Sequence, residues 1–289
     1  MPSYIIEERP GLPELILEHA GARVRLSLQG AHITEYFVND ENLFWVSDSA
    51  RFSPGAAIRG GIPLCWPWFG ASLDDPEWPQ HGFARKSQFE PVSQDSNAEF
   101  TSAVLQLTRI STVPEWEAAA QLEFEVRLSD RLWMQMRTTN CSNRDLLVGC
   151  ALHSYFEVSD CGAVSIPALT GLDYLDKTKD FARKTQATPM KVEGEVDRVF
   201  LEPPSCVELV DPGYERTLSI EAWGHSDLVV WNPGPKVAAS MNDFDDDGFR
   251  QMICIEPALA LNNRKRLAPG ESFCVGQTLR CVHQVPRLT

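Results

Sequence analysis

Two ionisable side chains stand where apolar stretches of the sequence end. His153 follows Leu146-Leu-Val-Gly-Cys-Ala-Leu152, and Glu256 follows Met252-Ile-Cys-Ile255. An ionised carboxylate beside a buried strand is costly unless it is paired or hydrogen-bonded. A histidine and a glutamate in such places can form a general acid–base pair whose pKa values burial shifts toward neutrality. A histidine on an apolar strand is also common as a satisfied core residue, and the sequence does not show whether the two side chains meet.

Two glycine-containing segments carry basic side chains that a core does not require. The segment Ile58–Gly70 begins with Arg59 and is rich in glycine, proline and tryptophan. The segment Gln80–Arg85 combines an amide, the imidazole of His81 and a guanidinium around the bend expected at Gly82. Arginine suits phosphate because its planar fork offers paired donors. Both segments can therefore contribute donors to one anionic ligand, although each can equally be a loop or turn whose arginine is only solvated.

Three further features are better explained by structure than by chemistry. Trp66 and Trp68 could stack on a sugar ring, but a core role is the favoured interpretation. The segment Asp243–Gly248 has some likeness to a calcium loop, yet it lacks the spaced ligands and closing glutamate, which favours a solvated turn. The eight cysteines include no Cys-x-x-Cys pair and are expected to be buried free thiols in a reducing compartment. No metal or cofactor is therefore expected.

The overall charge limits the class of partner. The 289 residues include 26 Lys and Arg and 40 Asp and Glu, which gives a formal net charge of −14. Such a field repels nucleic acid and anionic membrane surfaces, so neither is expected as a partner. The N-terminus has no basic region followed by an apolar one, and no apolar run is long enough for a membrane span. We expect one domain over residues 1–289, monomeric and cytoplasmic.

Most of the chain follows a period of two, which predicts half-buried strands. The alternation is clearest in Arg23–Leu28, Leu122–Leu128 and Leu132–Thr138, and the short Ser129–Arg131 between the last two predicts a hairpin. Further strands are predicted over Ala103–Arg109, Leu146–Phe156, Val207–Val210, Thr217–Ala222, Leu228–Trp231, Met252–Glu256 and Ser272–Val282. Many strands with regular turns and no long helix predict an all-β protein, a large twisted antiparallel β-sandwich.

These segments together resemble the glucose-6-phosphate 1-epimerase family, the hexose-6-phosphate mutarotases, within the aldose 1-epimerase superfamily. The similarity runs from the N-terminal strands to nearly the C-terminus, and the ordered set of segments is more specific than any one of them. It is densest at Arg59–Gly70, Gln80–Arg85, Leu152–Phe156, Thr185–Phe200, Trp231–Pro233 and Cys254–Pro257. The resemblance implies the galactose-mutarotase-like fold, which agrees with the strand pattern.

The resemblance also implies roles for individual residues. His153 falls on the general acid of the family and Glu256 on its general base. The substrate-binding positions of the family fall on Arg59, Gln80, His81, Arg85 and Asp197. The implied reaction is interconversion of the α and β anomers of a hexose 6-phosphate, most naturally glucose 6-phosphate, without cofactor. An acid and a base acting together predict a bell-shaped dependence of activity on pH.

Two other functions fit the same sequence. A phosphosugar-binding or regulatory module would keep the fold without the reaction, because fold does not determine function. Binding alone, however, requires no acid–base pair. A glycoside hydrolase or lyase on a similar sandwich would normally use two carboxylates, whereas here the glutamate is matched with a histidine. A disaccharide-cleavage assay separates the hydrolase from the epimerase.

Overall fold

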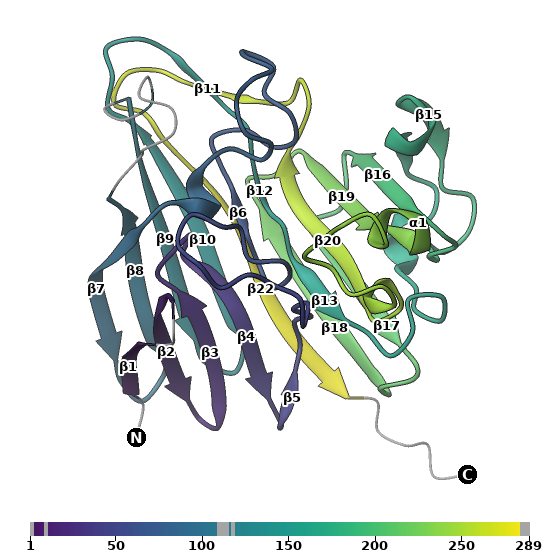
Figure 1. Ribbon diagram of the computed structural model, residues 1–289, viewed down its shortest axis with the longest axis horizontal. Helices are drawn as coiled ribbons and strands as arrows, with labels where there is room; N and C mark the ends of the chain where they lie inside the picture. Colours follow the sequence, from purple (N-terminus) through teal and green to yellow (C-terminus); the bar gives the residue numbers. More distant parts are fainter. Residues whose placement is uncertain (1–2, 9–10, 109–115, 117–118, 284–289) are drawn as a thin grey trace.

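The computed structural model of the protein describes residues 3–8, 11–108, 116 and 119–283. These residues form three large antiparallel sheets and one two-stranded ribbon (Figure 1). The seven-stranded sheet, called the long sheet below, forms one layer. The five-stranded and eight-stranded sheets lie side by side on it and form the second layer. The antiparallel β-sandwich predicted from the alternating pattern is therefore confirmed.

The long sheet has seven strands in the order β17-β18-β22-β10-β9-β8-β7. Their bounds are Cys206–Asp211, Arg216–Trp223, Ser272–His283, Leu132–Asn140, Ala120–Leu128, Thr101–Leu107 and Phe89–Ser96. Strands β9 and β10 alternate buried and less buried residues over their whole length, as their sequence predicts. They pair through a tight hairpin in which Leu128 lies opposite Leu132, so the predicted turn is confirmed.

The five-stranded sheet follows the chain order and covers β8 and β9. Its strands are β1 Ser3–Glu8, β2 Pro13–His19, β3 Ala22–Ser27, β4 His32–Val38 and β5 Glu41–Asn42. Only the third of these strands was predicted from the sequence. Strand β2 was missed because its burial does not alternate: four consecutive residues are buried, so no polar positions mark a period of two.

The eight-stranded sheet packs on β22 and has the order β15-β14-β16-β19-β20-β12-β6, with β13 also paired to β20. The bounds in that order, ending with β13, are Ala182–Thr185, Asp173–Asp176, Val196–Leu201, Asp227–Asn232, Met252–Leu259, Cys150–Leu152, Leu64–Cys65 and Tyr155–Glu157. Neighbours in this sheet come from distant parts of the chain. For example, β20 lies between β19 and the β12–β13 segment.

The remaining elements are short. The ribbon pairs β11 Leu146–Val148 with β21 Lys265–Leu267. One α-helix, α1 Gly234–Ala238, and four short 3-10 helices, η1 Ala84–Lys86, η3 Pro167–Leu169, η4 Lys177–Lys179 and η5 Gly248–Arg250, complete the described elements. No helix in the described part of the chain is long and apolar enough to cross a bilayer.

Three strand predictions need correction. Leu146–Phe156 is not one strand, because it is divided into β11, β12 and β13 by breaks at Gly149 and at the residues after Leu152. The strand that begins at Met252 continues through Pro257 to Leu259 and does not end at Glu256. Strand β8 ends at Leu107, and residue 109 of the predicted strand lies outside the described residues.

Candidate active site

The predicted site residues gather on the outer face of the eight-stranded sheet. Along β20, Ile253 and Ile255 point into the main core, while Cys254 and Glu256 point to the other face. Register places Glu256 opposite Val229 of β19, and Asp197 of β16 opposite the next residue on that face, Trp231. Because side chains alternate between the faces of a sheet, these strands present their functional groups on one surface.

His153 meets Glu256 because the sheet is interrupted beside both residues. Strand β20 pairs with β13 up to Cys254 and with β12 again from Ala258, so Glu256 and Pro257 face the break between those two strands. His153 occupies that break, and its Nδ1 lies 3.4 Å from Oε1 of Glu256. A proline fits a central strand at this point because the missing N–H falls where the ladder is already interrupted.

Arg59 reaches the site from a loop held close to the five-stranded sheet. A Cβ at Gly61, whose φ is +59°, would collide with the Ile33 carbonyl oxygen, so the approach requires glycine. The Nη1 of Arg59 donates to the Tyr155 hydroxyl at 3.1 Å, while Nε and Nη2 donate to Asp243 at 3.3 Å. The guanidinium is therefore held between an aromatic hydroxyl and a carboxylate.

The Gln80–Arg85 segment is bent as its glycine predicted. Gly82 has a φ of +68°, and any side chain there would collide with the Trp66 carbonyl oxygen. His81, at φ +64°, accepts a hydrogen bond from the Gly70 N–H on Nδ1 at 3.3 Å, so its proton is on Nε2 and can be donated to a ligand. Arg85 donates from Nη2 to the Gln80 carbonyl oxygen at 2.9 Å.

Asp197 is paired with a lysine that was not predicted from the sequence. The Nζ of Lys177 lies 2.7 Å from Oδ2 of Asp197, while the buried Oδ1 has no hydrogen-bond partner among the described residues. Register explains the pair, because Asp176 at the end of β14 lies opposite Arg198 and the next residues along are Lys177 and Asp197.

One cavity of about 350 Å³ collects all seven predicted residues. It is lined by Arg59, Phe69, Gln80, His81, Arg85, His153, Tyr155, Lys177, Asp197, Val229, Trp231, Met241 and Glu256. The imidazole of His153 stacks on Tyr155 with ring centroids 4.8 Å apart and an angle of 9° between planes, and Trp231 meets it edge-on at 6.0 Å. Aromatic packing therefore fixes the orientation of the imidazole.

Burial dominates the electrostatics of the pair. It lowers the pKa of His153 well below its usual value, and the charges of Arg85 and Arg59 act in the same direction. Burial also raises the pKa of Glu256 well above its usual value, helped by Asp197 and opposed by Lys177. Neither oxygen of Glu256 has a hydrogen-bond partner among the described residues. Burial therefore favours the uncharged form of each group at the 3.4 Å contact.

A cation could draw ligands from this site only after rearrangement. His153, Cys254 and Glu256 each offer one ligand atom, and these atoms lie within 4.8 Å of one another. Ligand atoms around a tetrahedral zinc ion lie closer, about 3.5 Å apart, given bonds of about 2.0–2.3 Å. The positions fit two groups that exchange protons with a ligand better than they fit a metal centre.

Features interpreted as structural have mixed outcomes. Trp66 and Trp68 are buried, and their indole N–H groups donate to Thr138 and to the Pro79 carbonyl oxygen, which confirms the core interpretation. The Asp243–Gly248 segment is a turn in which Asp246 and Asp247 are exposed, so the predicted solvated turn is confirmed in part. Its other residues are not merely solvated, because Asp243 binds Arg59, Phe244 is buried, and Asp245 accepts hydrogen bonds from the loop at residues 48–49.

The cysteines also differ in part from the prediction. All eight are free, but only four are buried. The thiols of Cys141 and Cys206 are exposed. Cys206 begins β17 at the edge of the long sheet, and Cys141 lies in the turn directly after β10, so both are at places open to solvent.

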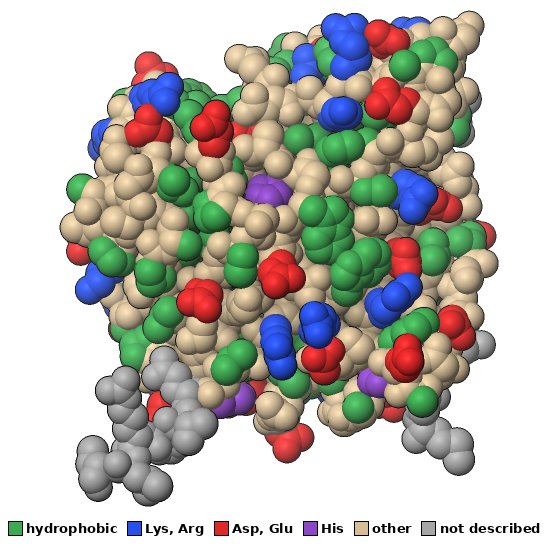
Figure 2. Space-filling model, turned by 180° about the vertical axis from the view of Figure 1, so that it is seen from behind, with side chains coloured by type: hydrophobic (Ala, Val, Ile, Leu, Met, Phe, Trp, Pro, Cys, Tyr) green, Lys and Arg blue, Asp and Glu red, His purple; other side chains and the backbone are tan. Residues whose placement is uncertain are grey.

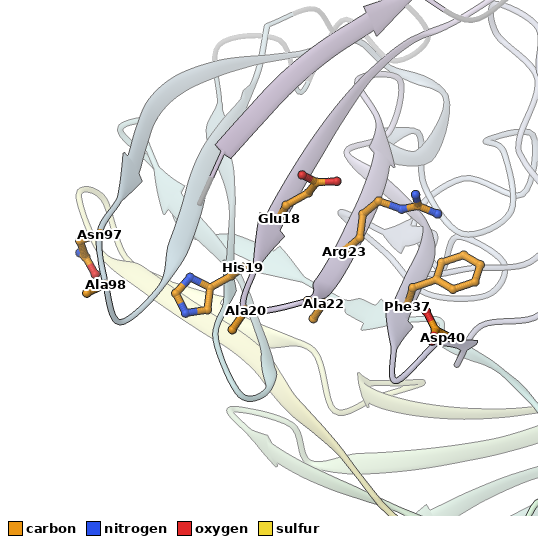
Figure 3. A pocket seen from close by; sticks show the side chains of 10 residues that line it. Glu18, His19, Ala20, Ala22, Arg23, Phe37, Asp40, Asn97 and Ala98 are labelled. Atoms are coloured by element: carbon orange, nitrogen blue, oxygen red, sulfur yellow. The ribbon is translucent and has the colours of Figure 1, made fainter. Parts of the chain in front are cut away.

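Other parts of the surface offer less chemistry. A hollow of about 640 Å³ lies where the β2–β3, β4–β5 and β7–β8 turns meet (Figure 3). Glu18, His19, Arg23 and Asp40 are its ionisable residues, and Arg23 lies over the ring of Phe37 and pairs with Glu35. Figure 2 shows the face opposite to that of Figure 1, where acidic and basic side chains are interspersed.

Six residues that line the cavity were not proposed as site residues: Phe69, Tyr155, Lys177, Val229, Trp231 and Met241. Three of them lie inside the segments that carry the resemblance, so a signal was present. Lys177 had none, because it lies in a polar stretch where a lysine suggests only solvent exposure.

Comparison with known proteins identifies the family of the chain. The family model described as aldose 1-epimerase matches residues 13–280. A relative in Cenchrus ciliaris, named "Putative glucose-6-phosphate 1-epimerase", is 33% identical over 93% of this chain and 84% of its own. A relative of the same name in Escherichia coli K12 is 30% identical over 87% of this chain and 84% of its own. A crystal structure of a "putative mutarotase" from Salmonella typhimurium superposes with a TM-score of 0.90 at 26% identity, covering 97% and 94% of the two chains.

Proposed function

The chain belongs to the aldose 1-epimerase family, and from this premise we propose that it interconverts the α and β anomers of a hexose 6-phosphate, with His153 and Glu256 as its acid–base pair. The observation that carries the proposal is the buried contact between these two groups in a polar cavity. A carboxylate without a hydrogen-bond partner is costly to keep in a protein interior. A ligand hydroxyl that it deprotonates supplies the missing partner.

The reaction requires the ring to open. Glu256 takes the proton of the C1 hydroxyl while His153 protonates the ring oxygen, and the bond between C1 and that oxygen breaks to leave an aldehyde. Rotation about the C1–C2 bond presents the other face of the aldehyde, and the ring closes with the two roles reversed. Each proton transfer contributes roughly 10²–10⁴-fold. The atoms balance without any further reactant.

The pair must hold a single proton in its active form. Burial by itself favours that proton on Glu256 beside a neutral imidazole. A phosphate group bound near His153 brings negative charge that favours the imidazolium, so substrate binding would move the proton toward His153. Loss of the proton at high pH, or gain of a second at low pH, stops the reaction. Activity is therefore expected to be bell-shaped in pH.

The proposed anion site is the end of the cavity that contains Arg59 and Arg85. Both guanidinium groups act electrostatically on His153. They supply local positive charge in a chain whose net charge is −14. Arg85 is the better phosphate donor of the two, because its buried Nε has no hydrogen-bond partner among the described residues, whereas Asp243 occupies one edge of Arg59.

The test is the rate of anomer interconversion of glucose 6-phosphate, measured by NMR exchange between the two C1–H signals. We expect acceleration by the wild type that is weaker on free glucose and lost in folded His153→Ala and Glu256→Ala. Binding of hexose phosphates without acceleration would instead establish a phosphosugar-binding module. Asp197 and Glu256 share one cavity, so a disaccharide-cleavage assay is included, since glycosidases use two carboxylates.

A further inference from the structure

The cavity has two ends with different charges. The cations that act on His153 are Arg85 and Arg59, whereas the charged groups that act on Glu256 are Asp197 and Lys177. The acid therefore has arginines as its charged neighbours, whereas the base has a lysine–aspartate pair. The difference follows from the fold: Arg59 comes from a loop and Arg85 from η1, both beside the five-stranded sheet, whereas Lys177 comes from η4 and Asp197 from β16 of the eight-stranded sheet.

A pyranose 6-phosphate fits this division in one direction. Its phosphate is carried on C6, and C6 is bonded to C5. C5 is in turn bonded to the ring oxygen that His153 protonates. On the other side of the ring oxygen is C1, where Glu256 acts, and the next ring carbons, C2 and C3, carry hydroxyls. The phosphate therefore lies toward the arginines, and the C2 and C3 hydroxyls lie toward Asp197 and Lys177. This orientation rests on the proposed function.

We propose that Lys177 is a positioning residue of this site, which holds the sugar hydroxyls together with Asp197 and supplies the positive charge that acts on Glu256. Its side chain is only partly exposed, at 31%, and its ammonium group binds one oxygen of Asp197 at 2.7 Å. An ammonium has three donors, so two remain for a ligand. The free, buried Oδ1 of Asp197 offers an acceptor beside them.

The backbone holds Lys177 in place over this pair. Lys177 begins the short helix η4, and the preceding Asp176 caps it by accepting from the Thr178 N–H at 3.1 Å and from the Thr178 hydroxyl at 2.7 Å. The other oxygen of Asp176 binds Lys184 at 2.7 Å. Lys179, two residues along the same helix, is exposed and does not line the cavity. The two lysines therefore form a matched pair for a test.

The charge of Lys177 has a definite effect on the base. The ionisable groups that face Glu256 are Asp197 on β16, Lys177 on η4, His153 and Tyr155 beside the break, Cys65 on β6 and Cys254 on its own strand. Lys177 opposes the rise in the pKa of Glu256 that burial and Asp197 cause. Without it, Glu256 keeps its proton to higher pH, so the alkaline limb of kcat/KM, which reports the free enzyme, moves to higher pH.

The experiment compares Lys177→Met, Lys177→Arg, Lys179→Met and Arg85→Met by anomer exchange on glucose 6-phosphate and on glucose. We expect Lys177→Met to lower kcat/KM roughly tenfold to hundredfold on both sugars by the same factor, as for loss of a charge-assisted hydrogen bond. The alkaline limb of kcat/KM moves to higher pH, and Lys177→Arg restores most of the rate and the position of that limb. Lys179→Met behaves as wild type, while Arg85→Met acts mainly on the phosphorylated sugar.

Two results would overturn the proposal. A loss confined to glucose 6-phosphate would make Lys177 a phosphate ligand, and a loss with an unmoved alkaline limb would leave it a merely structural anchor of Asp197. Titration of the carboxyl carbon of Glu256 by NMR, assigned from the signal missing in Glu256→Gln, reads the charge effect without any activity. An inactive wild type would therefore reject the epimerase while this titration still decides the role of Lys177.

Discussion

Two glutamates of this protein are equally buried but differ in their surroundings. Glu14 in β2 and Glu256 in β20 are each 1% exposed. An oxygen of Glu14 accepts from Nη1 of Arg25 at 2.8 Å, and the same guanidinium binds Glu35 through Nε at 3.2 Å. Both oxygens of Glu256 lack a hydrogen-bond partner among the described residues.

The difference separates a structural carboxylate from a chemical one. A buried charge is tolerated where a partner and hydrogen bonds compensate its desolvation, as in the Glu14–Arg25–Glu35 cluster of the five-stranded sheet. A buried carboxyl group left without such compensation is held at the expense of stability, and such groups concentrate at functional sites. Burial alone would not have distinguished the two glutamates, whereas their partners do.

The largest effect is expected for Glu256→Gln, which keeps the shape and removes the base. Anomer exchange should fall by roughly 10²–10⁴-fold. Stability should not fall. The pKa of Glu256 is raised in the folded state, so wild type loses stability as pH increases and this group ionises. The variant has no such group, so its melting temperature should rise relative to that of wild type between pH 5 and pH 8. A variant that is less stable at both pH values would contradict the comparison.

Glu14→Gln should produce the opposite pattern. It removes the carboxylate bound to Arg25 and should lower the free energy of unfolding by about 3 kcal/mol, measured by urea denaturation. The kcat/KM of the folded fraction should be unchanged, because the five-stranded sheet contributes no strand residue to the cavity. Glu90→Gln on the exposed face of β7 is the control and should change stability by less than about 0.5 kcal/mol. A variant that loses activity but keeps the stability of wild type would overturn the structural assignment of Glu14.

The comparison extends to two arginines. The guanidinium of Arg25 binds the carboxylates of Glu14 and Glu35. The buried Nε of Arg85, in contrast, has no hydrogen-bond partner among the described residues. Arg85→Met should weaken binding of glucose 6-phosphate by roughly tenfold or more and leave glucose nearly unaffected. It should also reduce the salt dependence of binding, measured by calorimetry at two ionic strengths. Equal losses for both sugars would place the phosphate elsewhere.

The smallest effect is expected for Tyr155→Phe. The variant loses the hydroxyl that accepts from Arg59 at 3.1 Å but keeps the ring on which His153 stacks. The rate of anomer exchange should fall by roughly two- to fivefold, as for one net hydrogen bond. Tyr155→Ala, which also removes the stacking surface, should lose more. Equal losses in the two variants would mean that the ring does not orient His153.

Local patterns predicted much of the fold. Alternation identified β9 and β10 because each has one face in the core and the other partly exposed. Strands buried on both faces, and strands that contain proline, gave weaker signals. Pro257 suggested the end of a strand, and the chain continues to Leu259 because the break beside His153 removes the need for an N–H there.

The residue types of the site were also visible in the sequence, since an apolar strand that contains a carboxylate needs a reason for it. The meeting of those residues was not visible. It depends on pairings such as Val229 with Glu256 and Ala151 with Ala258, between segments far apart in the chain. The sequence by itself determined an all-β chain with an acid, a base and cations in recognisable segments. Only the tertiary structure decided that all of them line one cavity and that Lys177 joins them, because sheet register is set by long-range packing that no local pattern contains.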